Sequence, residues 1–244
     1  MFLGTRDWKG TVQMDRQHII EQAEHFVQNV HSGDGSGHDW WHIHRVRNMA
    51  LAIARKEQAD LFVCELAALL HDVADEKLNP SKEAGLLRVR SWLEAHIEDP
   101  SVISEVMEII STMSYNGGKN PPMATLNGQI VQDADRLDAM GAIGIARTFA
   151  YGGSRGRSMH EPGQDFSDLD YRSHEKTTIY HFYEKLLKLK DLMNTRHARK
   201  LAESRHEFML RFLEQFYREW DAADEHQDEQ TTTNSGDMSE NRIF

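Results

Sequence analysis

The sequence predicts an all-α protein, and three of its features support this prediction. Apolar residues recur at intervals of three and four along most of the chain, which places them on one face of a helix. No segment alternates apolar and polar residues as a half-buried strand does. Capping residues, prolines and glycines also mark several helix ends. A chain of 244 residues is long enough for one helical core, so we expect a single domain.

Five helices are expected in the first half of the chain. Asp39 is a favourable N-cap for the second helix, and Asp99-Pro100 combines a cap with a proline in the first turn of the fifth. The third contains an almost continuous apolar run, which indicates a helix in the core. In chain order, the five are expected at about 19–30, 39–53, 60–73, 81–93 and 101–113.

The second half is expected to begin with one long helix, 130–151, which ends at Gly152-Gly153. A polar loop, 154–170, follows this helix. Two long helices then complete the domain, at roughly 173–193 and 196–222.

The same patterns predict the domain limits. Residues 1–14 are expected to form an N-terminal lead, and residues 15–222 the helical domain. The segment 223–244 is acidic, rich in Thr, Ser and Gln, and nearly free of apolar residues. Because such a segment has little to bury, we expect it to be a disordered tail.

The charge of the chain argues against some partners. Its 39 acidic and 28 basic residues give a formal net charge of −11, whereas a nucleic-acid binder normally presents a basic face to phosphates. A nucleotide is compatible with this balance, because a metal ion and a few cations can reverse the field within one pocket. The single cysteine, Cys64, is expected to be a buried thiol in a reducing, cytoplasmic setting. No apolar stretch approaches the ~20 residues that cross a bilayer, so no membrane association is expected.

The dipeptide His71-Asp72 closes the apolar run 66–70. An imidazole and a carboxylate at the end of a buried run are costly unless something pairs with them, and a divalent metal ion pairs with both. His42, on the apolar face of its helix, and Asp135, among small residues, are two further ligand candidates. Two imidazoles and two carboxylates leave positions for water and substrate oxygens, as a catalytic ion requires.

The order His, His-Asp, Asp resembles that of the HD-domain superfamily of metal-dependent phosphohydrolases. The resemblance depends on His-Asp-x-x-His-x-x-Arg-Val at 38–46, His-Asp-x-x-Asp at 71–75 and Gln-Asp-Ala-Asp-Arg-Leu-Asp at 132–138. It covers about 15–217 and implies a single HD-domain helical bundle with loops around a buried metal site. Within the superfamily, the chain looks like the small bacterial HD-domain nucleotide pyrophosphohydrolases, which release pyrophosphate from nucleotides with a divalent metal ion.

The resemblance also implies roles for individual residues. His42, His71, Asp72 and Asp135 would bind one divalent ion. Mn²⁺ is the first expectation for that ion, and Ni²⁺, Co²⁺, Fe²⁺, Zn²⁺ and Mg²⁺ are the alternatives. Many relatives place a glutamate three residues after the His-Asp pair to orient water. Asp75 stands at that position here.

Residues near the ligands are expected to complete the site. Asp75 would orient the attacking water, with Glu76 as the next carboxylate and Lys77 as a catalytic cation. Charge on the phosphoryl oxygens also needs fixed cations. The residues expected to contact substrate are His38, Arg45, Lys119, Arg136, Asp138, Arg155 and Arg157.

Three functions are consistent with these residues. The leading one is a nucleoside triphosphate pyrophosphohydrolase, and the second is a 5′-nucleotidase or another phosphomonoesterase. The third is an HD module that senses a nucleotide without turnover, which the intact ligand set disfavours. No short motif encodes the nucleotide preferred, and the two long C-terminal helices are compatible with a homodimer. The remaining helical histidines are expected to be solvated: His18, His25, His31, His96, His174, His181, His197 and His206.

Overall fold

The computed structural model describes residues 8–31, 39–115, 117, 120, 123–164, 166 and 177–223, with side chains from Arg16 onward. The first helix begins at Trp8, so it already includes part of the segment 1–14 that we expected to precede the domain. The tail expected at 223–244 lies outside the described residues, apart from Ala223.

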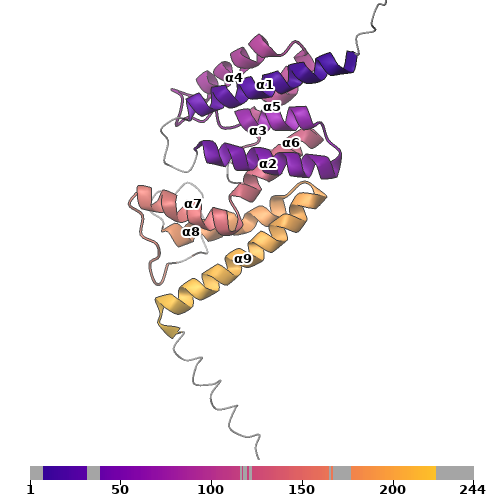
Figure 1. The fold of residues 1–244 in the computed structure, drawn as a ribbon. Coiled ribbons are helices and arrows are strands. Elements are labelled where there is room, and N and C mark those ends of the chain that lie inside the picture. The colour runs from indigo at the N-terminus through magenta and orange to yellow at the C-terminus, as the bar shows by residue number, and fades with distance from the viewer. Residues whose placement is uncertain are drawn as a thin grey trace, which may run out of the picture.

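The described part of the chain is helical and contains no strand, which confirms the all-α prediction (Figure 1). Among these residues, no helix is long and apolar enough to cross a membrane. The elements are α1 (Trp8–Val30), α2 (Trp40–Glu57), α3 (Leu61–Leu70), α4 (Lys82–His96), α5 (Pro100–Thr112), α6 (Leu126–Asp138), α7 (Gly141–Ser154), α8 (Thr178–Glu184), the 3-10 helix η2 (Leu186–Leu192) and α9 (Arg196–Trp220).

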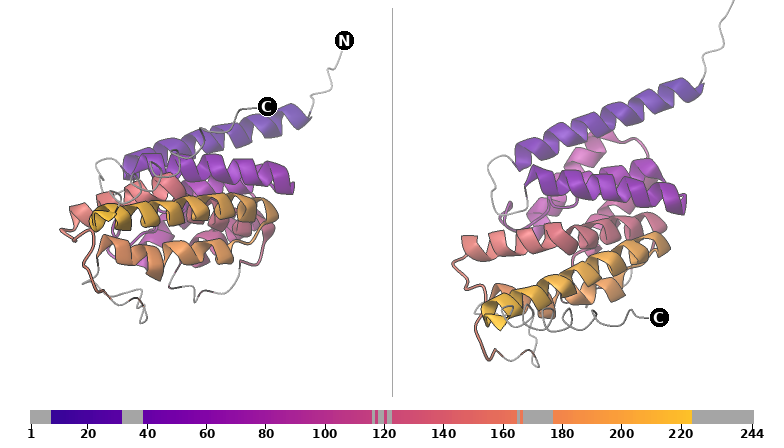
Figure 2. Two further views of the ribbon diagram at one scale, coloured as in Figure 1. Left: turned by 90° about the horizontal axis from the view of Figure 1, so that it is seen from below. Right: turned by 60° about the horizontal axis from the view of Figure 1, so that its bottom comes forward.

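Helix α3 forms the centre of the core. It packs against α1, α2, α5 and α6, and most of its side chains are fully buried, as its apolar sequence predicts. Helix α2 packs against both α3 and α6, and α9 packs against α6 and α7 on the side of the molecule away from α1 (Figures 1 and 2). This arrangement brings the ends of α3 and α6 close to the first turn of α2.

Cys64 on α3 is fully buried, as expected. Burial raises the pKa of its thiol to about 12, and the carboxylates of Asp60 and Glu105 act in the same direction. The Sγ atom lies 3.5 Å from Oδ1 of Asn127 on α6. The thiol is therefore a protonated core group.

Predicted caps set the start of two helices. The Asp39 side chain accepts a hydrogen bond from the backbone N–H of His42, at 3.0 Å, and caps α2. Asp99 accepts one from the N–H of Ser101 and is followed by Pro100 in the first turn of α5. These caps satisfy N–H groups that have no partner within the helix.

The single helix predicted at 130–151 is wrong, because the chain turns between α6 and α7. Met140 is extended (φ −119°, ψ 161°), and Gly141 has a φ of +70°, which a residue with a side chain rarely adopts. A Cβ atom on Gly144 would collide with the carbonyl group of Ala139. The turn therefore depends on two glycines, and it directs α7 back over the end of α6.

Two other predicted boundaries also differ from the structure. The helix expected to run to residue 73 ends at Leu70, so His71 and Asp72 lie in the turns that follow α3. The long helix predicted at 173–193 is divided, within the described part, into α8 and η2. Lys185, between them, has φ −133° and ψ −62°, which are not helical values.

Asp133 ties α6 to the start of α9. It is completely buried, and its carboxylate accepts hydrogen bonds of 2.8 Å from the backbone N–H groups of Asn194 and Thr195. Thr195 is in turn the N-cap of α9. Several donors thus satisfy the buried carboxylate of Asp133. Its hydrogen bonds also fix the position of the residues at which α9 begins.

We expect Gly144→Ala to destabilise the protein by about 1–3 kcal/mol, because the added methyl group has no room against Ala139. The matched control is Gly153→Ala in the same helix, where a Cβ would meet nothing within 4 Å. Alanine favours a helix over glycine, so the control should be neutral or slightly stabilising. Thermal melting of both variants tests the account, and equal melting temperatures would contradict it.

Candidate metal centre

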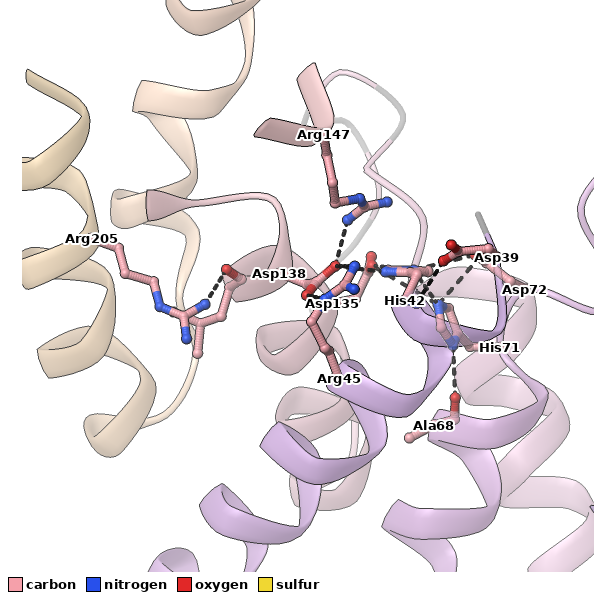
Figure 3. A network of polar contacts seen from close by, with 11 residues as sticks. Asp39, His42, Arg45, Ala68, His71, Asp72, Asp135, Asp138, Arg147 and Arg205 are labelled. Atoms are coloured by element: carbon pink, nitrogen blue, oxygen red, sulfur yellow. Dashed lines mark hydrogen bonds and ion pairs between the residues drawn. The ribbon is translucent and has the colours of Figure 1, made fainter. Parts of the chain in front are cut away.

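Four side chains converge where α2, the end of α3 and α6 meet (Figure 3). His42 lies in the first turns of α2, His71 and Asp72 follow α3, and Asp135 lies on α6. Both imidazoles are buried, and His42 is only 1% exposed. The structure therefore brings together all four ligands that the sequence predicts.

Three of these side chains form a group that could hold one ion: His42, His71 and Asp72 each offer a ligand atom, and these atoms all lie within 4.8 Å of one another. Asp135 is not a member of this group, but it lies close to both imidazoles. The Nε2 atoms of His42 and His71 are 3.3 Å apart. Asp72 Oδ2 lies 3.3 Å from His42 Nε2, and Asp72 Oδ1 lies 3.4 Å from His71 Nε2. Asp135 Oδ1 is 3.5 Å and 3.9 Å from the same two nitrogens. Ligand atoms about 2 Å from a common ion have separations of this size.

Each imidazole has its other nitrogen engaged by an oxygen atom. His71 Nδ1 lies 2.8 Å from the carbonyl oxygen of Ala68, to which it donates. His42 Nδ1 lies 2.8 Å from Asp138 Oδ2 and donates to that carboxylate. Both Nε2 atoms are thereby turned toward the centre. This orientation is the one that buried partners impose on histidines that bind metals.

Asp138 lies behind His42 and is 5% exposed. Arg45 donates two hydrogen bonds to it, at 2.7 and 3.1 Å, and Arg147 donates one at 2.6 Å (Figure 3). Burial alone would raise the pKa of this carboxyl group, but His42 and the two guanidinium groups hold it well below its usual range. Asp138 is therefore an ionised anchor for the His42 ring.

The same contacts act on His42. Burial would lower the pKa of its imidazole, but hydrogen bonds to Asp138 and Asp72 raise it to about 9. The carboxylates around the ring thus favour positive charge at this position. A divalent cation at the same place would benefit from the same field.

A cavity of about 960 Å³ opens from the metal centre. Of the residues expected to act on substrate, five line it: Asp75, Glu76, Lys77, Arg136 and Arg157. Arg45 and Asp138, which we expected to contact substrate, are placed behind His42, and neither they nor Arg155 lines the cavity. His38 and Lys119 lie outside the described residues.

The Arg136 side chain makes a hydrogen bond within the protein as well as lining the cavity. Its Nη1 atom donates to the carbonyl oxygen of Leu192, and burial lowers the pKa of its guanidinium group. It nevertheless lines the cavity. The guanidinium group is thus held by Leu192 and still borders the open cavity.

Three cations gather around the ring of Tyr151, and we call this group the Tyr151 cluster. Lys77 Nζ lies 5.5 Å from the ring centroid, and the guanidinium carbons of Arg155 and Arg157 lie 5.4 and 5.6 Å from it. Within the described part of the chain, none of the three forms an ion pair with a carboxylate. Lys77, Tyr151 and Arg157 line the cavity.

The structure also places in the cavity residues that the sequence did not indicate. Arg147 from α7 lines it, and so do His181, Glu184 and Lys185 from the end of α8. Burial lowers the pKa of Lys185, whereas Asp135 and Glu184 act to raise it, so its ammonium group lies within electrostatic reach of a metal ligand. No spacing rule links α8 to the metal motifs, because only the fold brings them together.

Among the described histidines that we expected to be solvated, His31 and His181 differ from that expectation, and His174 lies outside the described residues. His31 at the end of α1 is 4% exposed. His181 lines the cavity, where its Nδ1 lies 2.7 Å from Glu184 Oε1.

An all-α fold in which two imidazoles and two carboxylates converge at an open cavity is the arrangement expected of a metal-dependent hydrolase. The HD domain family model matches residues 40–140. YpgQ of Bacillus subtilis (strain 168) is 41% identical over 199 residues, which are 80% of this chain and 90% of YpgQ.

Solved structures agree with this match. That of an HD-superfamily hydrolase from Bacillus thuringiensis is 48% identical, with a TM-score of 0.69, over 85% of this chain and 99% of that one. The structure of Bacillus subtilis YpgQ in complex with ADP is 38% identical, with a TM-score of 0.69, over 84% of this chain and 96% of that one. The chain therefore belongs to the HD-domain family of metal-dependent phosphohydrolases, and it is a hydrolase.

Asp138→Asn should weaken the affinity for a divalent metal ion by about 10–100-fold, because the His42 ring loses the charge that orients it. His71→Ala removes a ligand and should abolish stoichiometric binding. Competition with a metal-sensitive dye measures both effects, and melting curves check that each variant is folded. The control is Asp191→Asn, whose side chain is 78% exposed. Wild-type affinity in Asp138→Asn would contradict the anchoring role of Asp138.

Proposed function

We propose that the protein hydrolyses (deoxy)nucleoside triphosphates at the α-phosphorus and releases pyrophosphate. The proposed ligands of its divalent ion are His42, His71, Asp72 and Asp135, and Mn²⁺ is the ion that we propose first. One observation carries the proposal: the Tyr151 cluster borders the same cavity as the metal centre.

The charge of the Tyr151 cluster favours a polyanionic ligand. Three cations around one ring repel each other, and the described residues supply no carboxylate ion pair for them. The chain as a whole carries a formal charge of −11, so this local excess of positive charge is an exception. A chain of phosphates matches such a group of cations better than a single phosphate does.

A relative supports the nucleotide part of the proposal. The structure of Bacillus subtilis YpgQ was determined in complex with ADP. We extend nucleotide binding to this chain because the two proteins share the fold over most of their length. The α-phosphorus as the site of attack comes from the likeness to the nucleotide pyrophosphohydrolases of the family.

The residues of the chain suggest how the reaction is divided among them. A bound divalent ion would acidify water and neutralise phosphoryl charge. Asp75 Oδ1 accepts a hydrogen bond of 2.8 Å from the backbone N–H of Lys77, which holds the segment 75–77 in a tight turn at the cavity wall. We assign to Asp75 the orientation of the attacking water. We assign to Lys77 and Arg157 the binding of the departing phosphates, whose charge grows as the bond breaks.

The products test the proposal directly. With Mn²⁺ and a panel of nucleoside triphosphates, we expect pyrophosphate and the monophosphate, separated by anion-exchange chromatography. Orthophosphate together with the diphosphate would reject attack at the α-phosphorus. Turnover confined to nucleoside monophosphates would show a phosphomonoesterase instead, and binding without turnover would show a sensor.

Asp75→Asn should keep the metal ion but lower kcat by about 10²-fold or more, because the amide cannot accept the proton of water. Glu76→Gln is the matched control, since Glu76 is the adjacent, exposed carboxylate of the same turn. Single-turnover kinetics at measured metal content compares the two variants. If Glu76→Gln shows the larger loss, the role belongs to Glu76.

A further inference from the structure

His181 and Glu184 form a polar pair in the cavity wall that the metal chemistry does not use. The two residues lie one turn apart on α8, and His181 Nδ1 is 2.7 Å from Glu184 Oε1. Glu184 is 7% exposed, whereas the His181 side chain is 27% exposed. The carboxylate is thus buried behind an imidazole that can reach the open volume.

The pairing determines which nitrogen of His181 is available. An ionised carboxylate can only accept hydrogen bonds, so Nδ1 of His181 carries the proton that lies between them. The second oxygen of Glu184, Oε2, is buried and has no hydrogen-bond partner among the described residues. With Nδ1 directed at Glu184, Nε2 is the ring nitrogen that is left for a ligand in the cavity. A proton on Nε2 makes that atom a hydrogen-bond donor.

Helix α8 places the His181 imidazole between two cationic parts of the cavity. Its first residue, Thr178, packs so closely on Gly152, next to Tyr151, that a Cβ atom at position 152 would collide with it. Beyond its last turn, the ammonium group of Lys185 lies 5.1 Å from the ring of Tyr115. Thr178, His181, Lys185 and Tyr115 all line the cavity. His181 thus lies along the wall that leads away from the Tyr151 cluster.

We propose that His181, oriented by Glu184, donates a hydrogen bond from Nε2 to a phosphate oxygen of the substrate. This inference rests on the proposed function and adds a binding residue to it. Phosphate oxygens accept hydrogen bonds, so an N–H at Nε2 is the matching donor. Glu184 is a positioning residue, because it acts through His181 and not on the substrate.

Binding measurements separate this role from a structural one. Isothermal titration of the wild-type protein and of His181→Ala, at equal and measured metal content, uses pyrophosphate, ADP and adenosine as ligands. Loss of a hydrogen bond to a charged phosphate should weaken the binding of pyrophosphate and of ADP alike by about 10-fold or more. His181→Gln retains an N–H donor and should recover part of the affinity. Glu184→Gln should also weaken both ligands, and His25→Gln, at an exposed position of α1, should change neither.

Each outcome is decisive. Unchanged affinity for pyrophosphate in both His181 variants would overturn the inference, and so would a loss confined to ADP, which would assign His181 to the nucleoside. Steady-state kinetics should show a higher KM for the triphosphate with little change in kcat. Wild-type protein that neither binds these phosphates nor releases pyrophosphate would refute the proposed function itself. Normal pyrophosphate release with an unchanged KM in His181→Ala would refute only this inference.

Discussion

The carboxylate of Asp138 is the interaction on which the site depends. It is buried at the end of α6, and it accepts hydrogen bonds from His42 and Arg45 on α2 and from Arg147 on α7. One charge therefore joins three helices and orients a ligand. Burying it is tolerable only because several donors surround it, and removing any donor would leave part of the charge uncompensated.

The cavity shows how local charge can differ from the net charge of a protein. The chain is acidic overall, and carboxylates surround the metal position. Other parts of the cavity wall carry cations, with Lys77 and Arg157 at Tyr151 and Lys185 at the end of α8. A low-dielectric wall makes each of these fields stronger than it would be in water. One pocket can thus attract both a divalent cation and the phosphates that such a cation accompanies.

The sequence predicted which side chains converge at the candidate metal centre, but it predicted only part of the cavity wall, for physical reasons. His42 and Asp135 are recognisable as ligand candidates because a metal ligand must have certain donor atoms at certain places on a helix. The break after α6 depends instead on contact between Gly144 and the backbone of a neighbouring turn, which no local pattern records. Likewise, the sequence alone suggested that Asp138 contacts the substrate. The structure shows that it is buried behind His42 and accepts a hydrogen bond from that ring. His181 enters the cavity because α8 is short and packs against the end of α7.

The burial of Cys64 links the core to the metal centre. This thiol lies on α3, the helix that ends at His71, and it is sealed against α6, which carries Asp135. Because Cys64 is fully buried, a reagent that modifies thiols can reach it only when the packing around α3 opens locally. The rate of Cys64 labelling therefore reports local unfolding around the helix that leads to His71. The protein contains its own probe for that motion, at a single position.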